Sequence, residues 1–243
     1  MLRGLYHLAF NPRARREWRW MFLTAITKRL MPGYRLQWPQ TLWWSDKQFN
    51  SYLARFHELD GYNSDRRWLI SQLVKLAANV PGDTAECGVL EGSSSYLIAK
   101  AFPNRTHHAF DSFEGCSAPS GTDNGYFSTG DLAVTLEQAA KNLADCPNVV
   151  FHKGWIPERF ADVSETRFAF VHIDVQLEQP TGDSLQFFYP RMNHHGIMVF
   201  DDYGFTTCPG ARRVIDEIMK DKPEPIIALP NGCAFIVRNG SQT

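Results

Sequence analysis

The chain has 243 residues, a formal net charge of −1, and 44% hydrophobic and 21% charged residues. This composition is sufficient for one α/β domain with additions, and it excludes a globally disordered chain. The near-zero net charge gives no argument for nucleic acid, and we expect none as a partner. The five cysteines contain no CxxC pair. We therefore expect neither a zinc site nor a disulfide framework, and a cytoplasmic location.

Residues 1–45 form a basic, tryptophan-rich extension. Its first 35 residues hold eight basic side chains against Glu17 alone. These charges interrupt any apolar core of a signal peptide, and the charge-free run 20–27 is far too short to span a bilayer. Two interpretations remain open for residues 1–35: peripheral contact with a membrane or an anionic glycan, or packing as a helical lid or dimer arm. We also expect a homo-oligomer.

Residues 46–82 are predicted to form a helical cap. Two sets of apolar residues recur at helical spacing before the break at Pro81 and Gly82. The first set is Phe49, Tyr52, Leu53, Phe56 and Leu59, and the second is Trp68, Leu69, Leu73, Val74 and Leu76. The main domain would then be 83–243.

Strands and helices are predicted to alternate from residue 83 onward. The expected strands are 83–89, 106–110, 149–152, 168–174, 196–200, 226–228 and 233–237, and the expected helices are 93–101, 132–143, 184–189 and 211–219. This alternation is typical of an α/β, doubly wound, mostly parallel sheet, here of seven strands. We expect an N-terminal helical extension before it. Ligands of such sheets bind at the carboxyl ends of the strands. The polar loop 112–130 is in a suitable place for a lid.

The segment AECGVLEGSSS at 85–95 predicts a glycine-rich turn between the first strand and the first helix. Gly88 and Gly92 tolerate positive φ, and the helix start beyond them offers unpaired N–H groups to an anion near Ser94. Asp111, about 20 residues further on, is placed to accept hydrogen bonds from ribose hydroxyls. The spacing differs from the dinucleotide pattern, and no Gly-Lys-Ser/Thr follows. A nucleoside without a pyrophosphate, S-adenosylmethionine, is therefore favoured.

Carboxylates follow two further strands: Asp174, and then Asp201 with Asp202. Three acidic groups that converge on one edge repel one another unless a cation lies between them. Mg²⁺ prefers such hard oxygen ligands, and it can bind vicinal hydroxyls and lower the pKa of one. Trp155, after the third strand, is placed to flank an adenine ring.

The histidines are expected to be structural. His194 and His195 are interpreted as turn residues before the fifth strand. His172 is interpreted as a core histidine whose ring nitrogens have hydrogen-bond partners. His107 and His108 open the second strand, at the end away from the expected site.

The segments AECGVLEGSSS, FDSFEG, KGWIPERF, VHIDVQLEQPT and VFDDYG resemble the TylF/MycF (macrocin O-methyltransferase) family. The resemblance implies a Rossmann-like class I methyltransferase that uses S-adenosylmethionine and Mg²⁺ to methylate a sugar hydroxyl. It implies donor contacts from Glu86, Gly88, Leu90, Gly92 and Ser94 at the methionine end, from Asp111 with Ser112 at the ribose, and from Gly154, Trp155 and Ile156 at the adenine. It also implies metal ligation by Asp174, Asp201 and Asp202.

The chain departs from the family pattern after the fourth strand. Gln176 replaces a second acid, and Glu178 replaces a tyrosine. Catechol O-methyltransferases, which the arrangement also resembles, place a lysine base where this chain has Leu177. Asp174 is therefore the first choice for the base, and deprotonation of the hydroxyl by a water stays open. Asp174 is also assigned to the donor site. Three alternatives stay open: a catechol-like or other vicinal-diol acceptor, a donor-binding module of a glycan pathway without turnover, and a membrane-tethered assembly factor.

Overall fold

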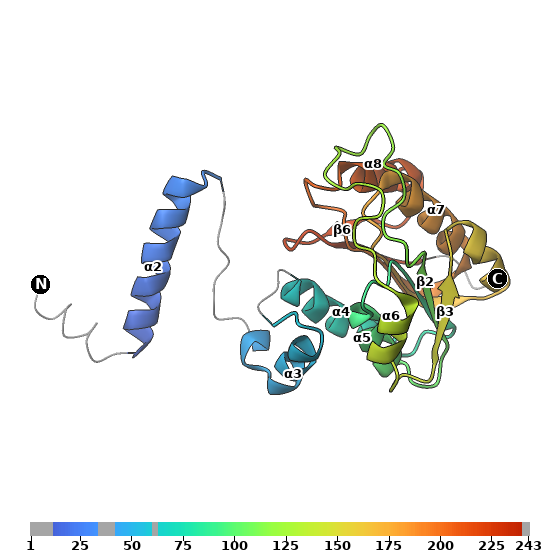
Figure 1. Ribbon diagram of the computed structural model, residues 1–243, viewed down its shortest axis with the longest axis horizontal. Coiled ribbons are helices and arrows are strands. Elements are labelled where there is room, and N and C mark those ends of the chain that lie inside the picture. Colours follow the sequence, from blue (N-terminus) through green and yellow to red (C-terminus); the bar gives the residue numbers. More distant parts are fainter. Residues whose placement is uncertain (1–11, 34–41, 60–62, 240–243) are drawn as a thin grey trace, which may run out of the picture. The chain divides into compact units, whose positions relative to one another are not determined.

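The computed structural model describes residues 12–33, 42–59 and 63–239 (Figure 1). The chain divides into two compact units, 1–52 and 53–243. The finer division predicted at residues 45 and 82 stays a prediction. Arg3 and Arg35 of the basic extension lie outside the described residues.

The first unit contains helix α2 (Pro12–Leu30), the 3₁₀ turn η1 (Leu42–Ser45) and most of α3 (Lys47–Arg55). Helix α2 lies in the N-terminal extension that is predicted to be helical, and it exposes several large apolar side chains among its basic ones. These are Trp18, Met21, Phe22, Leu23, Ile26 and Leu30. Within the described ranges, no helix combines the length and the apolar character needed to cross a membrane.

The second unit is built on a seven-stranded sheet with the order β3-β2-β1-β4-β5-β7-β6. The first five strands pair in parallel, and β7 runs antiparallel to both β5 and β6. The bounds are β1 (Asp83–Cys87), β2 (His107–Asp111), β3 (Val149–Lys153), β4 (Phe168–Ile173), β5 (Met192–Phe200), β6 (Ile227–Ala228) and β7 (Ala234–Val237). The α/β, mostly parallel sheet that the sequence predicts is thereby confirmed.

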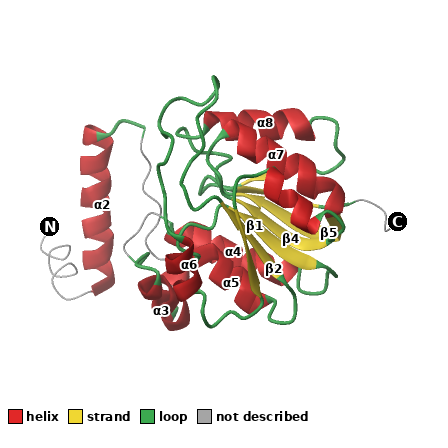
Figure 2. Ribbon diagram, turned by 45° about the vertical axis from the view of Figure 1, so that its right-hand side comes forward, coloured by secondary structure: helices red, strands yellow, loops and turns green. Residues whose placement is uncertain are grey.

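Helices cover both faces of the sheet, with α7 and α8 on one side and α4 and α5 on the other (Figure 2). The bounds are α4 (Ser64–Leu76), α5 (Ser93–Ala101), α6 (Leu136–Asn142), α7 (Glu178–Phe188) and α8 (Pro209–Met219), with 3₁₀ turns η2 (Glu158–Val163) and η3 (Tyr189–Arg191). All six residues of β4 are buried, as expected for a central parallel strand between two helical layers.

One core cluster lies under α4 and α5, and another under α7 and α8. Ile70, Leu73 and Ile98 pack with Phe170 and Val199 in the first. The second joins α7 and α8 to the other sheet face through Phe168, Leu185, Phe188, Met198 and Ile215. Burial of apolar area on both faces holds the strand ends, and hence the site, in place.

Three local predictions are wrong. Helix α6 begins at Leu136 and not at residue 132, because the Thr135 hydroxyl caps it by accepting from the Gln138 N–H at 3.2 Å. Helix α7 begins at Glu178, six residues before the predicted start, since Pro180 falls in the first turn, where no N–H is needed.

The third concerns the histidines before the fifth strand. Strand β5 begins at Met192, so His194 and His195 lie inside it and not in a preceding turn. The pairing with β4 shifts register after Met192, and His195 has φ of +64°. The strand is therefore locally irregular at the two histidines.

Candidate active site

The turn between β1 and α5 is shaped by three residues with positive φ: Gly88 at +85°, Leu90 at +51° and Gly92 at +89°. The Gly88 N–H donates to the Phe110 carbonyl of β2 at 2.9 Å. The backbone thus turns at the carboxyl end of β1, as the glycine pattern predicts, and presents its N–H groups toward the end of β2.

Asp111, the last residue of β2, binds this turn directly. Its Oδ2 accepts from the backbone N–H of Val89 at 2.7 Å and of Leu90 at 3.0 Å. Its Oδ1 accepts from the Phe113 N–H at 2.7 Å. These bonds fix the carboxylate at the end of the strand, with one donor on Oδ1, so that oxygen can still accept a ligand hydroxyl.

A cavity of about 310 Å³ opens at the carboxyl ends of the strands. Of the residues assigned to the donor, those that line it are Gly88, Leu90, Ser94, Asp111, Ser112, Gly154, Trp155, Ile156 and Asp174. The structure brings these together from the ends of four strands. Further lining residues that the sequence analysis does not single out include Arg67, Cys116, Gln179 and Asp183.

Glu86 and Gly92, which the resemblance assigns to the donor, do not line the cavity. Gly92 takes the N-cap position of α5, where a Cβ would meet the Leu143 side chain. Glu86 is completely buried beneath the turn, where the Ser95 hydroxyl donates to its carboxylate and His172 Nδ1 lies 2.7 Å from Oε1.

The buried charge of Glu86 is compensated by histidines. Burial alone would raise the pKa of Glu86, but His107 and His172 beside it hold that pKa below its usual range. The His107 Nε2 atom lies 3.9 Å from Oε2. Both nitrogens of His172 face carboxylates, Glu86 on one side and Asp201 on the other, so His172 is a core histidine with two partners.

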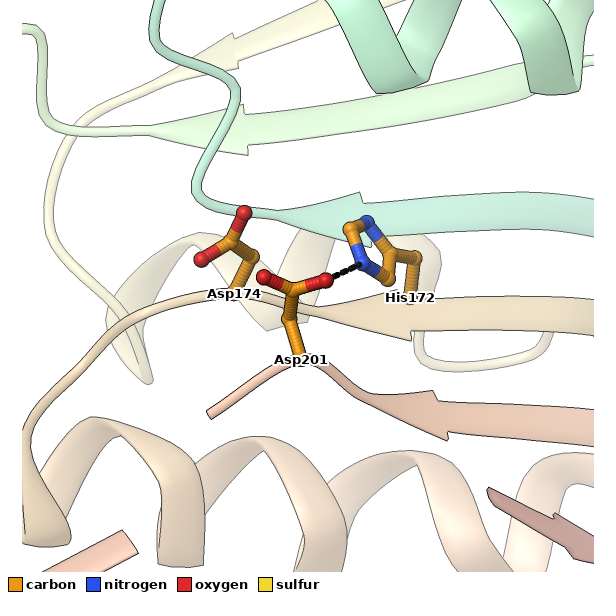
Figure 3. A group of neighbouring side chains, drawn as sticks. All are labelled: His172, Asp174 and Asp201. Atoms are coloured by element: carbon orange, nitrogen blue, oxygen red, sulfur yellow. Dashed lines mark hydrogen bonds and ion pairs between the residues drawn. The ribbon is translucent and has the colours of Figure 1, made fainter. Parts of the chain in front are cut away.

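Asp174 follows β4, and Asp201 and Asp202 follow β5, so all three predicted metal ligands lie at adjacent strand ends. Ligand atoms of His172, Asp174 and Asp201 lie within 4.8 Å of one another, and Figure 3 shows these three side chains together. Asp202 is not part of this group, because its two oxygens have other partners. Its Oδ2 accepts from the Gln176 N–H at 2.9 Å, and the Cys208 thiol donates to Oδ1 at 3.7 Å.

Other side chains of the protein also contact the carboxylates of Asp174 and Asp201. The Gln176 side-chain amide donates to Asp174 Oδ1 at 2.8 Å, and Arg67 Nη1 lies 3.9 Å from Oδ2. Arg66 Nη1 donates to Asp201 Oδ2, and His172 Nε2 lies 3.3 Å from Oδ1. Neither arginine of α4 is predicted from the sequence, because no strand-end pattern points to a helix that precedes β1.

The donor set fits a divalent cation. Burial, and after it the nearby negative charge of Asp174, raises the pKa of Asp202. Carboxylate oxygens are the ligands that Mg²⁺ prefers. Asp174 and Asp201 are the best-placed oxygen ligands in this structure, and Asp202 would join them by turning from Gln176.

A family model described as macrocin-O-methyltransferase (TylF) matches residues 69–237. The chain is 31% identical over 153 residues to the 8-demethyl-8-(2,3-dimethoxy-alpha-L-rhamnosyl)-tetracenomycin-C 4'-O-methyltransferase of Streptomyces olivaceus, covering 56% of this chain. It is 30% identical over 159 residues to the demethyldecarbamoylnovobiocin O-methyltransferase of Streptomyces niveus, covering 57% of this chain. The match spans 58% of the length of each of these relatives.

Solved structures agree with the fold. The O-methyltransferase NovP superposes with a TM-score of 0.61 at 25% identity, covering 75% of this chain and 84% of NovP. The calicheamicin methyltransferase CalS11 superposes with a TM-score of 0.65 at 19% identity, covering 89% of this chain and 91% of CalS11. The fold is the Rossmann-like one of O-methyltransferases.

Proposed function

Because the chain belongs to the macrocin-O-methyltransferase (TylF) family, we propose that it is an S-adenosylmethionine- and Mg²⁺-dependent O-methyltransferase that acts on a sugar hydroxyl of a glycoside or natural product. One observation carries this proposal: a single cavity is lined by the glycine turn, by Asp111, by Trp155 and by Asp174. S-adenosylmethionine bound along the glycine turn, Asp111 and Trp155 would end beside the carboxylates of Asp174, Asp201 and Asp202.

The proposed donor contacts follow from the cavity wall. Ser94, in the first turn of α5, faces the end where the methionine carboxylate would meet the unpaired N–H groups and the positive end of the helix dipole. Asp111 Oδ1 would accept from a ribose hydroxyl. Trp155 and Ile156 would border the adenine, with the partly exposed indole of Trp155 at the rim of the wall.

The acceptor would bind where Asp174 borders the cavity. S-adenosylmethionine supplies the methyl group, and Mg²⁺ held by Asp174, Asp201 and Asp202 would make the acceptor hydroxyl more acidic. Asp174 is the proposed base. Gln176 holds its Oδ1, so Oδ2 is the atom that would take the hydroxyl proton. Holding the reacting oxygen within about 3–3.5 Å of the methyl carbon would supply much of the rate.

The sugar acceptor is supported by a relative whose name specifies 4'-O-methylation of a rhamnosyl-tetracenomycin. A catechol-like or other vicinal-diol acceptor is the alternative for the same site. A donor-binding module without turnover is a second candidate. The ion pair of Arg66 with Asp201 favours it, since it neutralises a proposed metal ligand.

The exposed apolar and basic side chains of α2 support a further part of the proposal, peripheral contact of residues 1–35 with an anionic membrane. Flotation with anionic liposomes should carry the full-length protein and leave a variant lacking residues 1–35 behind. Equal flotation of both would exclude this contact. Cytoplasmic location and self-association stay predictions.

The deciding experiment combines binding and turnover on the full-length protein. Calorimetric titration with S-adenosylhomocysteine tests the donor site, and labelled S-adenosylmethionine with Mg²⁺ is then offered to rhamnosides, other glycosides and catechols. Transfer to glycosides alone supports the proposal, and transfer to catechols alone favours the alternative acceptor. Donor binding without transfer to any acceptor favours the module, and absence of donor binding contradicts the methyltransferase assignment.

A further inference from the structure

The acidic cluster of Asp174, Asp201 and Asp202 already contacts a positively charged side chain of the protein, the guanidinium of Arg66. Arg66, in the first turn of α4, places its Nη1 against Asp201 Oδ2, and the two side chains are 15% and 1% exposed. Asp201 is separated from Arg66 by 135 residues in sequence. The only other groups that contact this carboxylate among the described residues are His172 Nε2 at 3.3 Å and the Cys233 thiol at 3.4 Å.

Arg66 is held in this position by two further contacts. Its Nη2 donates to Asn63 Oδ1, and its guanidinium lies 5.0 Å from the centre of the Phe205 ring. Asn63 is the N-cap residue of α4, yet its side chain makes no cap hydrogen bond. The amide of Asn63 therefore orients Arg66 and leaves the helix start without a side-chain cap.

A guanidinium and a dication cannot share Asp201 in this geometry. Asp201 Oδ1 faces His172, and the other oxygen, on the side of Asp174 in Figure 3, is the one that accepts from Arg66. A metal ion between Asp174 and Asp201 would meet the guanidinium there, and two positive groups at contact distance repel strongly in a buried site. Conversely, a buried carboxylate without any cation would be strongly destabilising. Arg66 supplies that missing charge whenever no metal is bound.

We propose that Arg66 and a divalent cation exclude one another at Asp201, so that Arg66 keeps the acidic cluster folded without metal and sets how tightly the metal binds. This inference rests on the cation site of the proposed function. The apparent affinity for the metal is reduced by the fraction of molecules in which Arg66 occupies Asp201. Arg66 is thus a positioning residue that controls access to a ligand.

The test measures metal binding directly, with calorimetric titration of Mg²⁺ and Mn²⁺ into chelator-treated full-length protein. We expect Arg66→Gln to bind about tenfold more tightly or better. Asn63→Ala keeps every charge and removes one contact that holds Arg66, so it should bind more tightly by a smaller factor. Arg55→Gln removes a surface arginine paired with Asp145 and should bind as the wild type does.

Thermal unfolding supplies a second readout. In EDTA, Arg66→Gln should unfold at a lower temperature than the wild type, because Asp201 loses its counter-charge. Saturating Mg²⁺ should remove most of this difference. A variant that is equally destabilised with and without Mg²⁺ would contradict the exclusion.

The titrations also separate the inference from the proposal on which it rests. If the wild type binds Mg²⁺ and Arg66→Gln binds it no more tightly, the exclusion is wrong while the metal site stands. If Arg66→Gln binds more tightly but Asn63→Ala does not, the arginine acts only through its long-range charge, and the exclusion is again overturned. If neither protein binds a divalent cation although S-adenosylhomocysteine binds, the metal part of the proposed function fails, and the exclusion with it.

Discussion

The carbonyl oxygen of Asp174 lies 1.8 Å from the point where a Cβ on Gly88 would be. Asp174 and Gly88 directly follow the adjacent strands β4 and β1, and the Asp174 N–H donates to the Cys87 carbonyl at 2.9 Å. The glycine turn and the first proposed metal ligand are thus in backbone contact. No side chain fits between them.

Gly88→Ala should therefore damage both fold and site. The added methyl group collides with backbone, and φ of +85° is strained for alanine. We expect a loss of more than about 2 kcal/mol in the free energy of unfolding, measured by urea titration, with loss of S-adenosylhomocysteine binding. Gly121→Ala is the matched control, because nothing lies within 4 Å of its Cβ, and it should change stability by less than about 0.5 kcal/mol. Equal stability of the two variants would contradict the geometry.

Asp201→Asn should uncouple methyl transfer from donor binding. The substitution removes the negative charge proposed to hold Mg²⁺, while Asp201 does not line the donor cavity. Transfer should fall at least about a hundredfold, and EDTA should have the same effect on the wild type, reversed by excess Mg²⁺. S-adenosylhomocysteine affinity should stay near that of the wild type. Full activity in EDTA would exclude a metal in the reaction.

Asp111→Asn should weaken the binding of S-adenosylmethionine and S-adenosylhomocysteine. It removes the charged acceptor proposed for the ribose, and it loosens the hydrogen bonds to Val89 and Leu90 that shape the turn. The Kd for S-adenosylhomocysteine should rise about tenfold or more by calorimetry. Asp145→Asn, at an exposed carboxylate paired with Arg55 and Lys100, is the control and should bind normally. An unchanged Kd for Asp111→Asn would remove Asp111 from the donor site.

A buried histidine pair should contribute a loss of stability on mild acidification. His108 Nδ1 lies 3.0 Å from His152 Nε2, and burial lowers the pKa of His108 despite Asp83 nearby. The folded state thus disfavours a proton that the unfolded chain accepts near pH 6.5. This contribution is present above about pH 6.5 and is lost as the pH falls below it.

Urea titrations at about pH 7.5 and 5.5 check this expectation. His108→Gln should reduce the difference in unfolding free energy between the two pH values, while His57→Asn, at an exposed histidine, should leave it unchanged. The contribution of Glu86, whose pKa is lowered, is lost at still lower pH. Asp202, whose pKa is raised to about 7, contributes with the opposite sign, and its contribution is the same in the wild type and the variant and cancels in the comparison. A pH difference that His108→Gln leaves unchanged would contradict the prediction.

The loop 112–130 is attached to α7 through Asp123, whose Oδ1 accepts from the Glu178 N–H at 3.1 Å. Glu178 itself pairs with Arg213 of α8, so the residue that replaces the family tyrosine joins two helices. Asp123→Ala should free the loop and speed limited proteolysis within 112–130 several-fold, as measured by mass spectrometry. Thr122→Ala, one residue away and exposed, should be cut as slowly as the wild type.

The sequence predicts the sheet well because the central strands β4 and β5 contain short apolar runs and turn residues separate the strands. It does not predict how Glu86 is used, since both faces of β1 are buried and alternation does not distinguish the ligand side from the core side. The Arg66–Asp201 and Asp123–Glu178 contacts join segments that are distant in sequence. Only the packed fold brings their members together, so no local pattern identifies them.

The row Glu86–His172–Asp201 has a practical consequence for anyone who wishes to redesign this protein. Replacing one of these three residues by an apolar residue would leave its neighbour buried without a partner, because His172 bonds to Glu86 on one side and to Asp201 on the other. A designer can therefore substitute residues around the proposed acceptor site. The three residues Glu86, His172 and Asp201 have to be kept or moved to another protein together.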